Sequence, residues 1–252
     1  MLYVKSLKNK TILVTGSSRG IGKEIAYSFL NQGCKVVGIS NKKNIFSKNK
    51  KGKYFHFKCD LENEDNLKNC LINIKKKIKK IDVVINNASV SLQLIKNLNE
   101  DMKNFKKTLN VNLSSAFYIA YFFSKLMREK KIKGKILNIS SIGAKSAFSN
   151  NPGYTSSKSG LLALTKSIAI DFGKYGITSN AILPGYFNIG MTSKSSKKLN
   201  IKKQRLNRIL LNRYGKVEEL VNLIIFLASD YSKYITGQEI TIDGGFLVNS
   251  SN

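Results

Sequence analysis

The sequence has few of the residues on which many familiar active sites depend. Among its 252 residues are a single histidine, His56, two prolines, no tryptophan and only three cysteines. One histidine is too few for most Ser-His-Asp and Cys-His sites and for multi-histidine metal centres. Cys34, Cys59 and Cys70 form no C-x-x-C pair, which argues against a zinc ribbon or a disulfide framework. We therefore expect no metal site, and a reducing compartment, by default the cytoplasm.

Acidic residues are also scarce, and the chain carries a formal net charge of +28 at pH 7. Such a charge is typical of nucleic-acid-binding proteins. Here, however, lysines far outnumber arginines and are scattered along the chain, whereas nucleic-acid sites favour arginine forks interleaved with aromatic side chains. We interpret the charge as a lysine bias of solvated faces and expect no nucleic-acid partner. The charge would weakly attract anionic substrates or cofactors.

A membrane-spanning segment is not expected. The longest stretch without a charged residue, 175–193, contains Gly176, Pro184, Gly185 and Gly190, which would interrupt a spanning helix. The first ten residues lack the long apolar core of a signal peptide. We therefore expect no association with a membrane.

Short apolar runs alternate with segments of helical periodicity along the whole chain. Strands are predicted at 11–15, 35–40, 53–59, 81–86, 135–140, 178–183 and 239–243. Helices are predicted at 21–31, 63–79, 101–130 with a break near Asn110, 152–172, 201–212 and 217–229. This alternation predicts an α/β fold, a single Rossmann-type doubly wound parallel sheet of about seven strands with helices on both faces. Residues 1–252 would form one domain, with a substrate-covering loop at about 185–212, of which 185–200 is predicted to be mobile.

Three glycines follow the first predicted strand and open the first helix, in the run Thr15-Gly16-Ser17-Ser18-Arg19-Gly20-Ile21-Gly22. Gly16 permits a tight turn, Gly20 lets a pyrophosphate approach the backbone, and Gly22 lets the helix pack closely on the strand. The helix N-terminus then presents free N–H groups and a positive dipole end to phosphates. A glycine triplet alone indicates only a turn, but this strand-turn-helix setting at the first crossover favours a dinucleotide site.

Tyr154 and Lys158 lie four residues apart on one predicted helix, so their side chains share a face. A lysine ammonium beside a phenol favours the phenolate and lowers the tyrosine pKa from about 10, which makes the phenol a usable acid or base near neutral pH. Two other pairs have the same spacing. The pair at positions 54 and 58 falls in a strand, where the side chains lie far apart. The pair at 121 and 125 fits a core aromatic and a surface lysine better.

The glycine spacing G-x-x-x-G-x-G and the motifs after it resemble the classical branch of the short-chain dehydrogenase/reductase family over essentially the whole chain. These later motifs are Asn86-Asn87-Ala88-Ser89, Asn112, Ser141, Tyr154 with Lys158, and Pro184-Gly185. The sequence departs from the family at two positions. Ser89 replaces the usual glycine, which leaves the backbone there less free. Ile189 replaces a threonine, which removes one hydroxyl contact to the nicotinamide amide.

The resemblance implies the roles of the catalytic residues. Tyr154 donates a proton to the carbonyl oxygen during reduction, Ser141 hydrogen-bonds that oxygen, and Lys158 perturbs Tyr154 and binds the nicotinamide ribose. Asn112 supports a proton-relaying water next to Lys158; without the resemblance it would be interpreted as a helix cap. Ser141 is preferred to Ser140 because it lies thirteen residues before Tyr154, the usual family spacing, although the two serines are chemically indistinguishable.

The resemblance also implies a set of cofactor contacts. These are Gly16, Ser18, Arg19, Gly20, Ile21, Gly22, Ser40, Asp60, Leu61, Asn87, Ala88, Tyr154, Lys158, Pro184 and Gly185. Asn86 would contact the adenosine ribose. Asp60 would contact adenine, and it is also a candidate N-cap for the helix that begins near Asn63.

NADPH is expected as the cofactor rather than NADH. NAD enzymes of this type place an acidic residue at the end of the second strand, on the ribose 2′-hydroxyl. Here Ser40-Asn41-Lys42-Lys43 stands at that position without a carboxylate, and Arg19 is placed to fork onto a 2′-phosphate. The alternative is that Arg19 is solvated and both cofactors bind.

Within the family, motif spacing, length and the terminal Asp243-Gly244-Gly245 are most like the 3-oxoacyl-(acyl-carrier-protein) reductases. That likeness implies hydride transfer to the ketone of a 3-oxoacyl thioester, in a tetramer or dimer. The helices at 116–127 and 152–172 are candidate contact surfaces between subunits, and the alternative is that they pack within one subunit. An acidic acyl carrier protein would meet Arg128, Lys130 and Lys174 near the mouth of the site. Because loop 185–212 is polar, a second hypothesis is a sugar-like or other polar carbonyl substrate from a surface-glycan or nucleotide-sugar pathway. A third, a non-enzymatic basic binding module, fits the catalytic set poorly.

Overall fold

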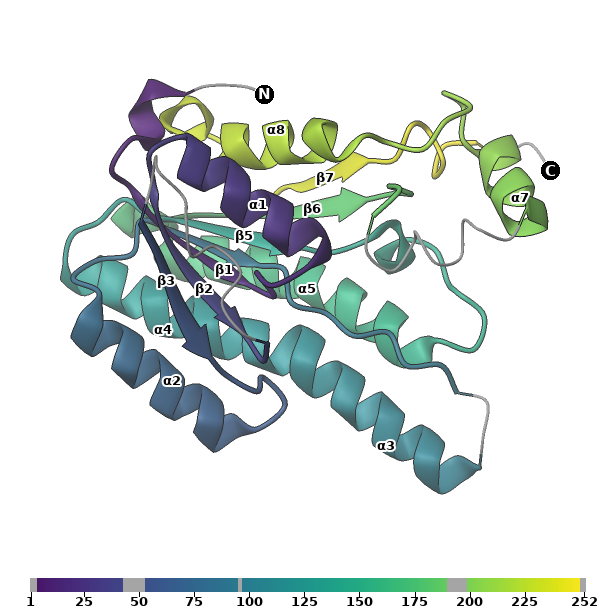
Figure 1. Cartoon of the computed structure of the whole chain (residues 1–252), viewed down its shortest axis with the longest axis horizontal. Coiled ribbons are helices and arrows are strands. Elements are labelled where there is room, and N and C mark those ends of the chain that lie inside the picture. The colour runs from purple at the N-terminus through teal and green to yellow at the C-terminus, as the bar shows by residue number, and fades with distance from the viewer. Residues whose placement is uncertain (1–3, 43–52, 95–96, 190–198, 250–252) are drawn as a thin grey trace.

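A parallel seven-stranded sheet forms the centre of the computed structural model, which describes residues 4–42, 53–94, 97–189 and 199–249. Its strand order is β3-β2-β1-β4-β5-β6-β7 (Figure 1). The strands are β1 (Thr11–Thr15), β2 (Lys35–Ser40), β3 (Lys53–Lys58), β4 (Val83–Asn86), β5 (Lys135–Ile139), β6 (Thr178–Pro184) and β7 (Glu239–Ile242). The doubly wound α/β fold predicted from the sequence is therefore confirmed. Each strand lies where its apolar run predicts it.

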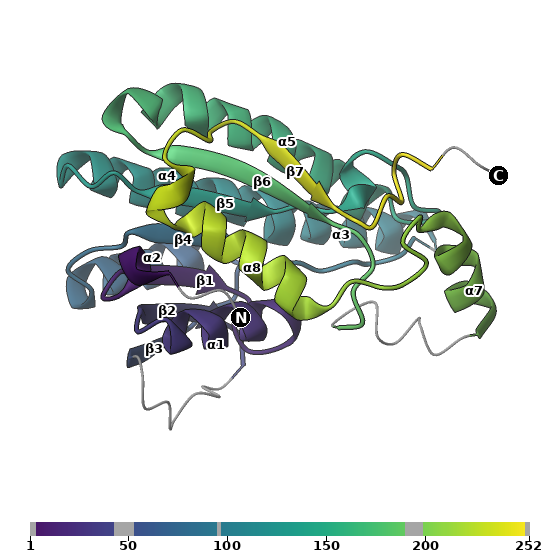
Figure 2. The ribbon, with the colours of Figure 1, turned by 90° about the horizontal axis from the view of Figure 1, so that it is seen from above.

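Helices cover both faces of this sheet (Figure 2). On one face α1 (Gly20–Asn31) packs beside α8 (Val217–Ala228), and on the other lie α2 (Glu64–Lys77), α4 (Ser115–Glu129) and α5 (Pro152–Phe172). The central strands β1 and β6 are buried along their whole length, because a sheet covered on both sides leaves no polar face. Within the described residues, no helix has the length and apolar character needed to cross a membrane.

The break predicted near Asn110 is present. Helix α3 (Leu98–Leu109) joins α4 through a π-helical turn over Asn110–Ser114, a rare geometry that often marks functional sites. Asn112, inside this turn, accepts a hydrogen bond from Val90 N at 2.8 Å and donates to Val90 O at 2.9 Å and to Ser157 Oγ at 3.0 Å. Asn112 is therefore not a helix cap. It fastens the helix to the chain after β4 and to α5.

Two predicted helices have bounds that differ by three or more residues in the structure, whereas the others agree to within two. The helix expected to begin at 101 begins at Leu98, because Asn97 caps it by accepting a hydrogen bond from Glu100 N. The helix expected over 201–212 is α7 (Leu199–Arg208), which ends early because Ile209 turns inward and is buried. Residues 190–198 of the predicted substrate loop lie outside the described residues.

A buried lysine begins β5 at the amino edge of the sheet. Lys135 is 4% exposed, and its Nζ donates a hydrogen bond to Ser232 Oγ at 3.0 Å. Lys10 and Lys233 lie nearby, and both pair with the carboxylate of Asp230. Burial, with a smaller contribution from Lys10, lowers the pKa of Lys135 to about 8.

We expect Lys135→Met to be more stable than the wild type at pH 7, with the difference closing as the pH approaches 10.5. The unfolded chain holds this proton up to a pKa of 10.5 and the folded chain only up to about 8, so the wild type gains stability from this residue as pH rises between those values. Below pH 8 the folded wild type retains the cost of a buried charge. Urea unfolding at pH 7 and pH 10 measures the effect. Parallel pH profiles for the two proteins would contradict it.

Candidate active site

The glycine turn is built as its sequence predicts. Gly16 and Gly20 have positive φ angles of 68° and 56°, a region that glycine occupies without strain. Thr15, at the end of β1, holds the turn against the end of β4. Its hydroxyl oxygen accepts hydrogen bonds from the backbone N–H groups of Asn87 at 3.0 Å and Ala88 at 2.9 Å. The side chain of Asn87 donates to Thr15 O at 2.9 Å.

Gly22 allows α1 to approach this turn closely. A Cβ added to it would lie 2.3 Å from Gly16 O and 2.4 Å from Asn87 Nδ2. Arg19 is the N-cap residue of α1, and its exposed side chain makes no cap hydrogen bond. The first N–H groups of α1 therefore lie next to the turn, as a phosphate-binding site requires. Ser18 and Ile21 lie half-buried within the same turn.

Two aromatic residues of β3 support the turn and the end of β2. The Tyr54 hydroxyl is 2.8 Å from Ser17 Oγ, and His56 Nε2 is 2.9 Å from Ser40 Oγ. Ser40 thus lies at the predicted place, the carboxyl end of β2, with its hydroxyl in contact with the only histidine. Sequence reasoning did not find these supports, because side chains two residues apart on an edge strand are not distinctive.

The residues expected around the adenosine differ in their placement. Asn86 is buried, and its amide donates to Ala116 O at 3.2 Å and Asn138 Oδ1 at 2.9 Å, so it faces the sheet interior rather than a ribose. Asp60 is exposed after β3 and accepts a hydrogen bond from Glu62 N. Asp60 is not the cap of α2, because the Asn63 side chain accepts from Asn66 N. Leu61, beside Asp60, is half-buried.

Tyr154, Lys158 and Ser141 come together at the carboxyl edge of the sheet. Tyr154 and Lys158 project from α5, and Ser141 follows β5 and hydrogen-bonds the Tyr154 hydroxyl. Lys158 Nζ lies 5.6 Å from the centre of the Tyr154 ring and donates to Ile139 O at 2.7 Å. Ser140 points the other way, donating to Lys158 O at 2.8 Å. The two serines, which residue chemistry alone left indistinguishable and of which the family spacing favoured Ser141, therefore point in different directions.

Burial dominates the electrostatics of this group. Tyr154 is 9% exposed and Lys158 is 2% exposed. Desolvation lowers the pKa of Lys158 to about 7. Burial also raises the pKa of the Tyr154 phenol, and the hydrogen bond from Ser141 opposes that rise. The expected lowering of the phenol pKa by Lys158 is not found. The ammonium is itself disfavoured in the dry site, and its proton is directed at the Ile139 carbonyl.

The other tyrosine–lysine pairs are engaged elsewhere. Tyr121, on α4, donates its hydroxyl hydrogen to Asp171, and Lys125 is exposed. Tyr54 contacts Ser17 as described, while Lys58 is exposed. Of the three pairs, the one on α5 is adjacent to a serine that follows β5.

The basic residues expected at the mouth lie at the opposite edge of the sheet. Arg128 and Lys130 end α4 just before β5 begins, and Lys174 follows α5 just before β6 begins. Arg128 and Lys174 rest on the ring of Tyr175. The strands begin at this edge, whereas Ser141 and Tyr154 lie at the opposite edge. Within one chain, the prediction that these basic residues lie near the mouth of the site is therefore wrong.

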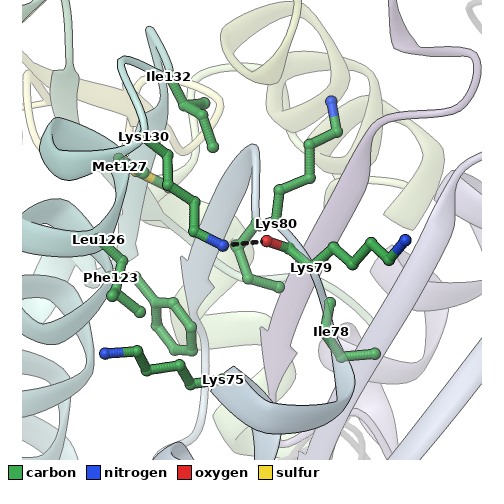
Figure 3. A pocket seen from close by; sticks show the side chains of 10 residues that line it. Lys75, Ile78, Lys79, Lys80, Phe123, Leu126, Met127, Lys130 and Ile132 are labelled. Atoms are coloured by element: carbon green, nitrogen blue, oxygen red, sulfur yellow. Dashed lines mark hydrogen bonds between the residues drawn. The ribbon is translucent and has the colours of Figure 1, made fainter.

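A small cavity at that far edge does not provide a substrate site. It is lined by the apolar side chains of Phe123, Leu126 and Met127 among others, and the Nζ atom of Lys130 reaches across to the carbonyl of Lys79 (Figure 3). Its volume is about 20 Å³, roughly the room for one water molecule. The chemistry-bearing residues are gathered at the carboxyl edge instead.

The residues at the carboxyl edge fit a dinucleotide. The glycine turn leads into the N-terminus of α1, which has no side-chain cap hydrogen bond, and an added Cβ at Gly22 would collide with the turn. Ser89, after β4, has a buried hydroxyl oxygen that has no hydrogen-bond partner among the described residues. Pro184 and Gly185 end β6 beside this edge, with Gly185 against Asp243. Ile189 packs against the apolar layer between the sheet and α1.

Comparison with known proteins agrees with this arrangement. A family model described as enoyl-(acyl carrier protein) reductase matches residues 16–247. The chain is 35% identical over 249 residues to the 3-oxoacyl-(acyl-carrier-protein) reductase FabG of Buchnera aphidicola subsp. Schizaphis graminum, covering 95% of this chain and 98% of that protein. It is 31% identical to the L-rhamnose 1-dehydrogenase (NAD(P)(+)) of Azotobacter vinelandii, covering 96% and 98%.

Among solved structures, a 4-hydroxyisoleucine dehydrogenase complexed with NADH superposes with a TM-score of 0.89 at 29% identity, covering 95% of this chain and 99% of that one. The chain therefore belongs to the short-chain dehydrogenase/reductase family. It is an NAD(P)-dependent oxidoreductase that acts on CH–OH or ketone groups.

We expect Gly22→Ala to lose dinucleotide binding and about 1–3 kcal/mol of stability, because the new methyl group collides with backbone that has no room to move. Titration calorimetry with NADPH and urea unfolding measure the two effects. Gly173→Ala is the matched control, since an added Cβ at Gly173 meets no atom within 4 Å. Normal NADPH binding by Gly22→Ala would show that close packing at this glycine is not required.

Proposed function

We propose that the protein reduces a ketone with NADPH and that the ketone belongs to a 3-oxoacyl thioester. The observation that carries this proposal is the contact of the Tyr154 hydroxyl with Ser141, one helical turn from a buried lysine. The substrate class is supported by a relative named as a 3-oxoacyl-(acyl-carrier-protein) reductase over nearly the whole chain. An acyl-carrier-linked substrate and a dimer or tetramer follow from the same likeness.

The residues divide the work of reduction among them. Bound NADPH supplies the hydride. Ser141 and Tyr154 both point hydroxyl groups at one place, where they hold the carbonyl oxygen and stabilise the negative charge that develops on it. Tyr154 then passes its proton to that oxygen. Lys158, with a pKa of about 7, exchanges protons readily near neutral pH and holds the nicotinamide ribose.

Asn112 holds in place two chain segments, one of which carries Tyr154. Its side chain bonds Val90 and Ser157, and Ser157 Oγ donates to Tyr154 O at 2.8 Å. The chain after β4 is thereby fixed to the turn of α5 that carries the tyrosine. The amide oxygen of Asn112 accepts one hydrogen bond, from Val90 N, and its second lone pair is the acceptor that we propose for the relay water.

The preference for NADPH rests on charge at the end of β2. Ser40, Asn41 and Lys42 offer no carboxylate to repel a 2′-phosphate, and Arg19 is exposed beside the glycine turn. The remaining cofactor contacts that we propose are the backbone and side chains of the turn, the segment after β4, Asp60 with Leu61 after β3, and Pro184 with Gly185. Residues 1–252 then act as one domain, in which 185–212 covers the substrate.

A second candidate substrate is a sugar-like or other polar carbonyl compound. It is favoured by the relative named as an L-rhamnose 1-dehydrogenase and by the polar composition of α7. Reduction of an acetoacetyl thioester, compared with a panel of polyhydroxy ketones and aldoses run in both directions, distinguishes the two.

We expect the wild type to reduce an acetoacetyl thioester and Tyr154→Phe to lose about a hundred- to ten-thousand-fold in turnover, because the variant has no proton to donate. NADPH fluorescence on binding should change little. Tyr121→Phe, which carries the same change in a pair of the same spacing, should keep its activity. If Tyr154→Phe kept the turnover of the wild type, Tyr154 would not be the proton donor.

Arg19→Ala should weaken NADPH binding by about ten- to a hundred-fold, the value of a hydrogen bond to a charged group, and leave NADH binding nearly unchanged. Dissociation constants for both cofactors, measured by fluorescence titration on both proteins, give the comparison. A wild type that prefers NADH, or an equal loss for the two cofactors, would overturn the assignment.

A further inference from the structure

An aromatic cluster, which we call the tyrosine wall, adjoins the candidate active site. Tyr186 follows Pro184-Gly185 at the carboxyl end of β6, and its ring stacks on that of Tyr214 at 5.9 Å. The edge of Phe246 meets the same ring at 5.3 Å. These rings pack with Ile142 and Ile209. Because Ile142 directly follows Ser141, the wall reaches the place where the carbonyl oxygen is held.

The wall also faces the proposed acid. Phe148 packs against it and against Tyr154, with the Phe148 and Tyr154 ring centres 6.3 Å apart. Tyr186 belongs to the same cluster as Phe148, which contacts Tyr154, and Tyr186 adds slightly to the rise that burial causes in the Tyr154 pKa. A substrate held by Ser141 and Tyr154 would thus have a second phenol beside it.

Two arginines of α7 lie over aromatic rings of the tyrosine wall. The guanidinium of Arg205 lies 4.5 Å from the centre of the Tyr186 ring and donates a hydrogen bond to the phenol oxygen. Arg208 lies 4.3 Å from the centre of the Phe246 ring. Arginine carries donors only, so the Tyr186 oxygen accepts from Arg205 and its own O–H stays available to another acceptor. Burial raises the pKa of the Tyr186 phenol and the positive charge of Arg205 opposes that rise, so the O–H keeps its proton and is able to donate.

We infer that Tyr186 is a substrate-binding residue that donates a hydrogen bond to a second oxygen of the substrate, next to the carbonyl that is reduced. In a 3-oxoacyl thioester this acceptor is the thioester carbonyl, one methylene away from the ketone. Arg205 is a positioning residue that acts through Tyr186. The inference rests on the proposed function for the identity of the second oxygen, while the donor itself is a property of this chain.

The test compares two substrates that differ only in that oxygen. One is an acetoacetyl thioester, and the other is the matched thioether ketone, in which a methylene replaces the thioester carbonyl. Tyr186→Phe should lose about ten-fold in kcat/KM for the thioester, mainly through KM, and less than about two-fold for the thioether ketone. Arg205→Gln should also lower the ratio of kcat/KM for the thioester to kcat/KM for the thioether ketone, but by a smaller factor than Tyr186→Phe.

Tyr175→Phe is the matched control, because Tyr175 also lies under an arginine, Arg128, but at the other edge of the sheet. It should leave both substrates unaffected. Equal losses for the two substrates in Tyr186→Phe would mean that the hydroxyl acts on Tyr154 or on folding, and no loss would mean that it touches neither oxygen; either result overturns the inference.

Failure of the proposed function is visible separately, in the wild type. If the wild type reduces no 3-oxoacyl thioester but turns over a polyhydroxy ketone, the same ratio is measured with that ketone and its analogue lacking the neighbouring hydroxyl. Tyr186→Phe should again lose only with the compound that carries the second oxygen. An unchanged ratio there would overturn the inference independently.

Discussion

A charged side chain enclosed where water is scarce is the constraint around which this site is built. Lys158 is almost fully buried, and its Nζ donates a hydrogen bond to the carbonyl of Ile139. An ammonium in such a place is costly, which is why its pKa falls to about 7. The position of the lysine depends on the register of α5 against the end of β5. That same register brings Tyr154 up to Ser141, so one packing relationship places both the proposed acid and the buried lysine beside it.

The surrounding polar network keeps that register fixed. Asn138 of β5 accepts from Asn86 of β4 and donates to Thr165 of α5 at 2.9 Å, all within the buried layer. Two buried amides and a buried hydroxyl, bonded in series across three elements, favour one alignment of those elements, because a slip would break these hydrogen bonds. Asn86 therefore contributes to the site by locking the sheet, which explains why it does not reach a ribose.

Much of this could be predicted from the sequence because the fold repeats one local rule. An apolar run bounded by glycine or polar residues gave each strand, and the glycine spacing placed the phosphate turn correctly. The side-chain partners could not be predicted. Ser140 and Ser141 are distinguished only by the pleat at the end of β5, and the support of Ser40 by His56 depends on the pairing of β2 with β3. The error over Arg128 arose because sequence distance from the tyrosine says nothing about which edge of the sheet a helix end reaches.

Tyr54 and His56 lie on β3, which is an edge strand of the sheet. Tyr54 contacts Ser17 in the glycine turn, and His56 contacts Ser40 at the end of β2. A margin that pairs on one side only is the part of a sheet that opens most easily. The glycine turn and the end of β2 are thus coupled to local opening at this edge of the sheet, whereas Ser141 and Tyr154 lie by the end of β5, an interior strand of the sheet. As the temperature rises, we expect nucleotide binding to weaken before the arrangement of Ser141 and Tyr154 is lost.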